Sequence, residues 1–149
     1  MTQASAMSAE DFLDALGRSG IYSARQIRDM LHRTPAEARR SAQSLARSFV
    51  EQSHLTMYQA KHLLRGTYRG LVLDNYEVRD FLGKGGMGSV YLAWDRAADR
   101  PCALKVLLPS KRTERRNVLR FEREMEVSRR LSHPGVAVAY SAGTSNGVH

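Results

Sequence analysis

Residues 83–90 read Gly83-Lys84-Gly85-Gly86-Met87-Gly88-Ser89-Val90, which fits the pattern G-x-G-x-x-G-x-V. Glycine lets backbone N–H groups approach phosphate oxygens without a Cβ in the way, and it accepts a positive φ. A dinucleotide-binding loop of this pattern should open a helix and be followed by an acidic residue about 20 positions later. Here the glycines lead instead into the strand-like run Val90–Trp94, and the nearest acidic residues come too early. We therefore expect a glycine loop that joins two antiparallel strands.

Strand signals lie on both sides of this loop. Apolar residues alternate in places over 76–82, and the run 90–94 puts Val90, Leu92 and Trp94 on one face. Further along, the pattern predicts a turn over 95–101 and a strand over 102–108. It then predicts a helix over 113–131, a break at 132–135, a short strand at 136–140 and a turn at 144–147, with the helix turning inward Phe121, Met125, Val127 and Leu131.

Helix-start signals dominate the chain before residue 70. Ser8, Ser23, Thr34 and Thr56 each precede by three positions a side chain that can complete a capping box. Apolar residues at helical spacing follow each signal, so the sequence predicts four short helices. A shift that lays Ser8 on Ser41 and Ser23 on Thr56 also aligns caps and apolar positions. The helices are therefore either two repeated hairpins or two similar amphipathic hairpins without a repeat.

Composition excludes several classes of protein. The 149 residues carry 23 Lys and Arg against 15 Asp and Glu, a net charge of +8 that favours anionic partners. A single cysteine excludes a disulfide framework, and the five histidines show no ligand spacing, so we expect no metal site. The apolar runs are too short for a membrane helix, and we expect a cytoplasmic location. Nucleic acid is a weak alternative partner, because stacking aromatics are missing near the basic group Lys111, Arg112, Arg115, Arg116, Arg120 and Arg123.

Two charged side chains follow the glycine loop at suggestive positions. Lys105 ends the run Ala103-Leu104-Lys105, and Glu124 lies at the edge of the apolar face of the expected helix. An unpaired carboxylate there would be costly, so a lysine that reaches across from the sheet would satisfy it. The same ammonium could then hold nucleotide phosphates. The alternative partners for Glu124 are Arg120 and Ser128, one turn away on the same helix.

Taken together, residues 76–149 resemble the N-terminal lobe of a bacterial serine/threonine protein kinase. Four segments carry the resemblance, in the family's order and spacing: Leu82–Val90, Ala103-Leu104-Lys105, Glu124, and His133-Pro134-Gly135-Val136. The resemblance implies an α+β fold, in which a small all-α helical domain precedes a truncated kinase lobe made of an antiparallel sheet and one helix. It also implies a supporting ion pair between Lys105 and Glu124, and an ATP site formed by Leu82, Gly83, Lys84, Gly85, Gly86, Met87, Gly88, Ser89, Val90, Ala103 and Lys105. Cys102 stands where the family usually has valine.

The sequence also departs from the family pattern. The 149 residues contain no His-Arg-Asp catalytic loop and no Asp-Phe-Gly motif. We therefore expect the Mg²⁺ ligands to lie beyond residue 149, and we expect no transfer of the ATP γ-phosphate to protein Ser or Thr by this chain alone. The alternative is a non-catalytic interaction or regulatory module with a vestigial nucleotide-binding lobe, whose helices dock a protein partner. The expected domains are a flexible N-terminus (1–7), a four-helix domain (8–66), a linker (67–75) and the truncated lobe (76–149).

Overall fold

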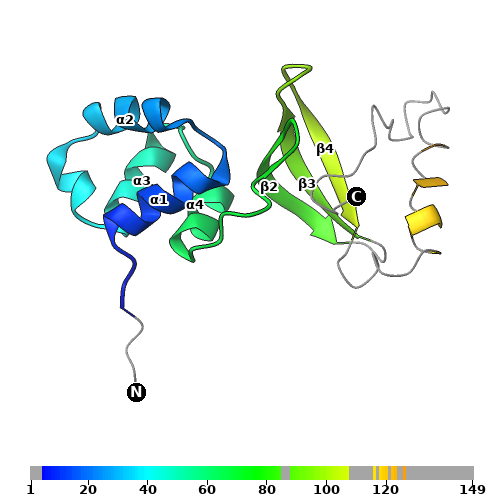
Figure 1. Ribbon diagram of the computed structural model, residues 1–149, viewed down its shortest axis with the longest axis horizontal. Helices are drawn as coiled ribbons and strands as arrows, with labels where there is room; N and C mark the ends of the chain where they lie inside the picture. Colours follow the sequence, from blue (N-terminus) through cyan, green and yellow to red (C-terminus); the bar gives the residue numbers. More distant parts are fainter. Residues whose placement is uncertain are drawn as a thin grey trace. The chain divides into compact units, whose positions relative to one another are not determined.

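The computed structural model describes residues 5–84, 88–107 and, further on, 116, 118–120, 122–123 and 126 (Figure 1). Four α-helices come first, with a short 3-10 helix between the second and the third. Four strands follow. The helices are α1 (Ala9–Ser19), α2 (Ala24–His32), η1 (Ala36–Arg40), α3 (Ala42–Glu51) and α4 (Met57–Leu64), and the strands are β1 (Val72–Leu73), β2 (Tyr76–Lys84), β3 (Gly88–Asp95) and β4 (Arg100–Leu107).

Three of the four predicted helix starts are confirmed. The hydroxyls of Ser8, Ser23 and Thr56 accept from the backbone N–H three residues on, in α1, α2 and α4 respectively. In each case the side-chain oxygen at that third position accepts a hydrogen bond from the backbone N–H of the cap residue, which completes the capping box. These reciprocal bonds satisfy donors that the first turn of a helix leaves without a partner.

The third predicted start, at Thr34, is wrong. The Thr34 hydroxyl is buried and donates to the carbonyl oxygen of Met30 at 2.7 Å, so it closes the end of α2 instead of opening a helix. The segment after Pro35 forms only the short 3-10 helix η1, without a side-chain cap. The chain then extends at Ser41, with φ −140° and ψ 158°, and the Ser41 hydroxyl caps α3.

The cap that Ser41 provides for α3 predicts the effect of a substitution there. Ser41→Ala removes the acceptor for the N–H of Ser44 and should lower the free energy of unfolding by about 1 kcal/mol. Chemical denaturation of the chain measures the change. Gln43→Ala, at an exposed position in the same helix, is the matched control and should change stability by less than about 0.5 kcal/mol. Equal effects of the two variants would contradict the role assigned to Ser41.

The two helical hairpins begin at corresponding positions. The shift that aligns Ser8 with Ser41 also aligns the start of α1 with the start of α3, and the start of α2 with the start of α4. Capping boxes occupy the corresponding sites in both hairpins. The bounds fit the repeated-hairpin interpretation, which stays a prediction.

The helices enclose one apolar core. Phe12 and Phe49 are fully buried, and their ring centroids lie 6.3 Å apart. Leu71, from the segment that we predict to be a linker, is only 2% exposed and belongs to this same core. Tyr68 and Val72 also pack against it. The chain therefore stays in contact with the helices until the sheet begins.

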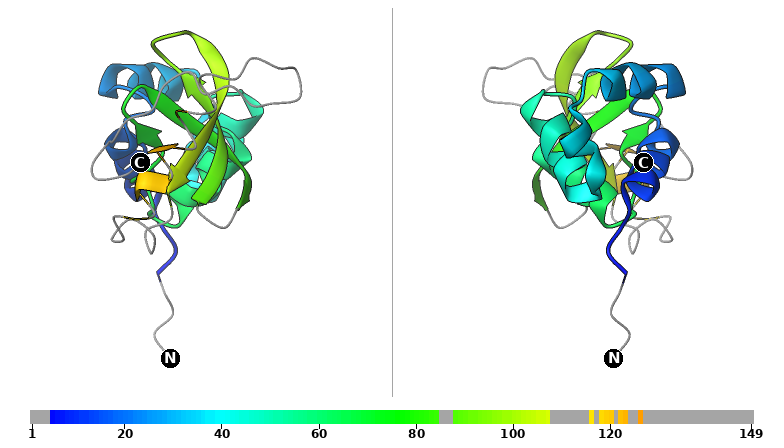
Figure 2. Two further views of the ribbon diagram at one scale, coloured as in Figure 1. Left: turned by 90° about the vertical axis from the view of Figure 1, so that its right-hand side faces the viewer. Right: turned by 90° about the vertical axis from the view of Figure 1, so that its left-hand side faces the viewer.

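The strands form one sheet in the order β1-β2-β3-β4 (Figure 2). In β1 and β2, Val72 is paired with Glu77 and Leu73 with Tyr76, antiparallel. Short connections join β2 to β3 and β3 to β4, and such connections fit only antiparallel neighbours. The strands predicted before residue 108 are thus present, although β4 begins at Arg100 and shortens the turn predicted over 95–101. The carboxylate of Asp95 accepts from two backbone N–H groups in this turn.

The described residues between 116 and 126 are helical, within the helix predicted over 113–131. The α+β class is therefore confirmed. Its expected inward-facing residues, Phe121, Met125, Val127 and Leu131, lie outside the described residues, as do the features predicted from 132 onward. The chain divides into two compact units: residues 1–80 with 93–102, and residues 81–92 with 103–149. No helix in the described part of the chain has the length and apolar character that crossing a bilayer requires.

Candidate functional site

The glycine loop joins two neighbouring strands, as the sequence predicts. Strand β2 ends at Lys84 and β3 begins at Gly88, while Gly85, Gly86 and Met87 lie outside the described residues. This arrangement excludes the strand-to-helix loop of a dinucleotide-binding fold. The strand ends that flank the loop and Lys105 all belong to the second compact unit.

Gly88 brings β3 against β4. A Cβ at this position would overlap the carbonyl oxygen of Val106 and would lie 3.0 Å from its carbonyl carbon and 3.3 Å from the Cα of Leu107. These are backbone atoms, which cannot turn aside as a flexible side chain does. Glycine is therefore required here by packing. Because Lys105 directly precedes Val106, the same contact places the lysine next to the end of the glycine loop.

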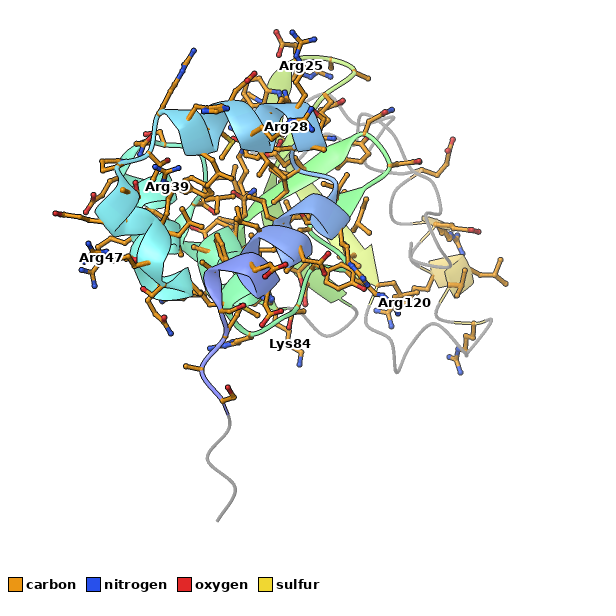
Figure 3. The ribbon with its side chains drawn as sticks, turned by 60° about the vertical axis from the view of Figure 1, so that its left-hand side comes forward. Arg25, Arg28, Arg39, Arg47, Lys84 and Arg120 are labelled. Atoms are coloured by element: carbon orange, nitrogen blue, oxygen red, sulfur yellow. The ribbon has the colours of Figure 1, made fainter. Side chains whose placement is uncertain are left out.

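Gly83, at the other end of the loop, has different surroundings. A Cβ built on Gly83 meets no atom of the described residues within 4 Å. Its neighbour Leu82 is 57% exposed, and the exposed Lys84 side chain extends away from the ribbon (Figure 3). The segment thus offers bare backbone, an apolar side chain and a cation at one strand end. These groups fit a ligand with a flat apolar part and an anionic part.

The remaining predicted site residues differ in exposure. Ser89 is buried, Val90 and Lys105 are half-buried, and Ala103 is exposed. Glu124 lies outside the described residues, so the ion pair between Lys105 and Glu124 stays a prediction.

Cys102 is half-buried on β4, where the family resemblance expects valine. Burial raises the pKa of its thiol, the nearby carboxylate of Asp95 raises it further, and Arg100 opposes both effects. The thiol therefore stays protonated at neutral pH, and a protonated thiol is a poor nucleophile and metal ligand. Across the described part of the chain, no group of three or more His, Cys, Asp or Glu side chains is placed to hold a metal ion.

Sequence reasoning missed the residues that connect the helices to the first unit's strands. Thr56 and Gln59 were assigned only to a helix cap, yet both also donate to carbonyl oxygens of β2. Arg96, in the turn after β3, was assigned no role and donates to two carbonyl oxygens that follow α1. No local sequence signal distinguishes these residues, because their partners lie far away along the chain.

Comparison with known proteins finds serine/threonine protein kinases of bacteria among the relatives of this chain. The chain is 37% identical over 81 residues to the serine/threonine-protein kinase PksC of Streptomyces coelicolor, a match that covers 53% of this chain and 15% of PksC. It is 40% identical over 70 residues to PknB of Mycobacterium leprae, covering 47% of this chain and 11% of that kinase. The crystal structure of a PknI kinase domain from Mycobacterium tuberculosis matches with 35% identity and a TM-score of 0.45, over 53% of this chain and 32% of that domain. No family model matches the chain.

About half of this chain is thus similar in sequence to bacterial serine/threonine protein kinases, which confirms the resemblance. The chain spans less than a fifth of the length of the two curated relatives named above.

Proposed function

We propose that residues 81–107 form the ATP-binding part of a serine/threonine protein kinase. In this function the backbone of the glycine loop and the ammonium of Lys105 hold the phosphates of ATP. Leu82, Val90 and Ala103 contact the adenine. The reaction served by the site is transfer of the γ-phosphate to a Ser or Thr hydroxyl of a protein substrate.

The close approach of β3 to β4 at Gly88 carries this proposal. Gly88 packs on the backbone of Val106, which directly follows Lys105, and this supports a site in which the lysine and the glycine loop bind the same phosphates. The sequence similarity to named kinases supports the assignment, because it favours phosphate binding for a loop that could otherwise be a plain hairpin turn.

Further parts of the proposal rest on the kinase resemblance alone. Glu124 orients Lys105 through an ion pair, and Mg²⁺ bound with ATP neutralises charge on the phosphates during transfer. The residues assigned here position the phosphates and stabilise their charge. They do not abstract the proton of the acceptor hydroxyl.

A phosphoryl-transfer assay tests the proposal. Because the 149 residues alone are not expected to transfer phosphate, the assay uses them joined to a kinase catalytic loop and an Asp-Phe-Gly segment, with Mg²⁺, ATP labelled at the γ-phosphate, and a mixture of peptides that contain serine, threonine or tyrosine. We expect label on serine or threonine. Label on tyrosine alone would contradict the assigned specificity, and the absence of any transferred label would contradict the kinase assignment.

A further inference from the structure

The N-terminus of α4 contacts the backbone of β2, entirely within the first compact unit. Gln59 is 1% exposed, and its side-chain amide donates to the carbonyl oxygen of Val78 at 2.9 Å. The hydroxyl of Thr56 donates to the carbonyl oxygen of Arg79 at 2.6 Å. Two consecutive carbonyl groups of the strand therefore take their hydrogen bonds from one helix end.

This helix end lies where the strand partner of β2 stops. Strand β1 has only two residues. The N–H of Val78 donates to the carbonyl oxygen of Leu71, the residue just before β1. A strand edge with open carbonyl groups would otherwise have to bind water or another chain. The amide of Gln59 takes the place of a third strand residue at this point.

Glu77 links the contact between α4 and β2 to a second contact, which Arg96 makes with the segment after α1. Its carboxylate, largely shielded from solvent, accepts a hydrogen bond from the side-chain amide of Gln59 at 3.3 Å and forms an ion pair with the guanidinium of Arg96 at 3.4 Å. Arg96 also donates to the carbonyl oxygens of Gly20 at 3.1 Å and Ile21 at 3.0 Å, after the end of α1. The second helical hairpin is therefore hydrogen-bonded to β2, and the segment after α1 to the turn between β3 and β4.

We infer that the helical segment is a clamp that holds β2, and that Gln59 is a positioning residue for nucleotide binding. Strand β2 continues without interruption from Val78 to Lys84, so a strand that opens at its first half loses order at the end that carries the glycine loop. The clamp itself stands on the contacts described above. Its effect on ATP rests on the proposed function.

The corresponding capping boxes of α2 and α4 supply a matched pair of substitutions. Gln26 holds in α2 the capping position that Gln59 holds in α4, and both amide oxygens accept from the N–H of their cap residue. Gln26 is exposed, and its side chain makes no hydrogen bond to a strand within the described part of the chain. Glutamate preserves the cap acceptor at either site. At position 59 alone it removes the donor to Val78 and sets a second carboxylate against Glu77.

The experiment compares Gln59→Glu with Gln26→Glu in the full chain. Hydrogen exchange of the Val78 amide and equilibrium binding of ATP are measured at a temperature where both variants are folded. For Gln59→Glu we expect exchange at least about tenfold faster and ATP affinity lowered about threefold to tenfold, because a buried carbonyl loses its donor. Gln26→Glu should leave both quantities at the wild-type values. If Gln59→Glu does not fold, Thr56→Asp against Ser23→Asp gives the same comparison, since aspartate caps a helix but cannot donate to Arg79.

The outcomes separate the clamp from the proposed function. Unchanged exchange in the variant would overturn the clamp. Faster exchange with unchanged ATP affinity would overturn the positioning role alone. A wild-type chain that binds no ATP would overturn the proposed function and the positioning role together, while the exchange result would still decide whether the clamp exists.

Discussion

Lys105→Met is expected to weaken ATP binding about tenfold to a hundredfold. The substitution keeps the length and apolar stem of the side chain and removes only the charge that is assigned to the phosphates. A hydrogen bond to a charged group contributes about 1.5–3 kcal/mol, which corresponds to this range of affinity. Calorimetric titration of the chain with ATP measures the loss. Adenosine, which lacks phosphates, should bind the variant and the wild type equally well.

A control separates the local charge from the net charge of the chain. Lys61→Met removes one positive charge from an exposed position of α4, away from the glycine loop in the sequence. Its ATP affinity should equal that of the wild type. Equal losses in the two variants would mean that ATP responds to the overall positive charge, and they would remove Lys105 from the site. In a polypeptide that joins these residues to a kinase catalytic loop and an Asp-Phe-Gly segment, Lys105→Met should also lower autophosphorylation.

Gly88→Ala is expected to destabilise the sheet by about 2–3 kcal/mol. The added methyl group would overlap the carbonyl oxygen of Val106, so β3 and β4 would have to separate locally. Overpacking against immobile neighbours costs about 1–3 kcal/mol, and backbone neighbours put this case at the upper end. Chemical denaturation, followed by the fluorescence of Trp94 on β3, measures the change.

The control for this substitution lies at the other end of the same loop. Gly83→Ala adds the same methyl group where no described atom lies within 4 Å, so stability should change by less than about 0.5 kcal/mol. Its expected effect is on ATP affinity instead, because the methyl group occupies the space assigned to phosphate. A stable Gly88→Ala variant would contradict the packing role of that glycine.

Local signals in the sequence predicted much of the fold. Capping boxes are formed by residues only three positions apart, so Ser8, Ser23 and Thr56 identify their helices without knowledge of the tertiary structure. The error at Thr34 has a tertiary cause. Its hydroxyl has two possible uses, and burial at the end of α2 favours the carbonyl of Met30. The true cap at Ser41 uses Ser44 as its partner, which is a weaker signature than glutamate or glutamine.

In the candidate site, too, the local features could be predicted from the sequence and the long-range contacts could not. The spacing of the glycines and the strand pattern around them predicted the hairpin, because both are local. The packing of Gly88 on Val106 depends on the pairing of β3 with β4. The contact between Gln59 and Val78 depends on the end of β1, and a capping glutamine looks the same with or without it. Contacts of this kind can be identified only in the three-dimensional structure.

Hydrogen exchange of the chain with ATP and with adenosine tests the central claim most directly. That claim is that the end of β2, the start of β3 and the part of β4 around Lys105 bind the phosphates of ATP. We predict that ATP slows exchange in these three segments more than adenosine does, and that Lys105→Met removes the difference. Equal protection by the two ligands, or protection by ATP only in the helices α1–α4, would contradict the account.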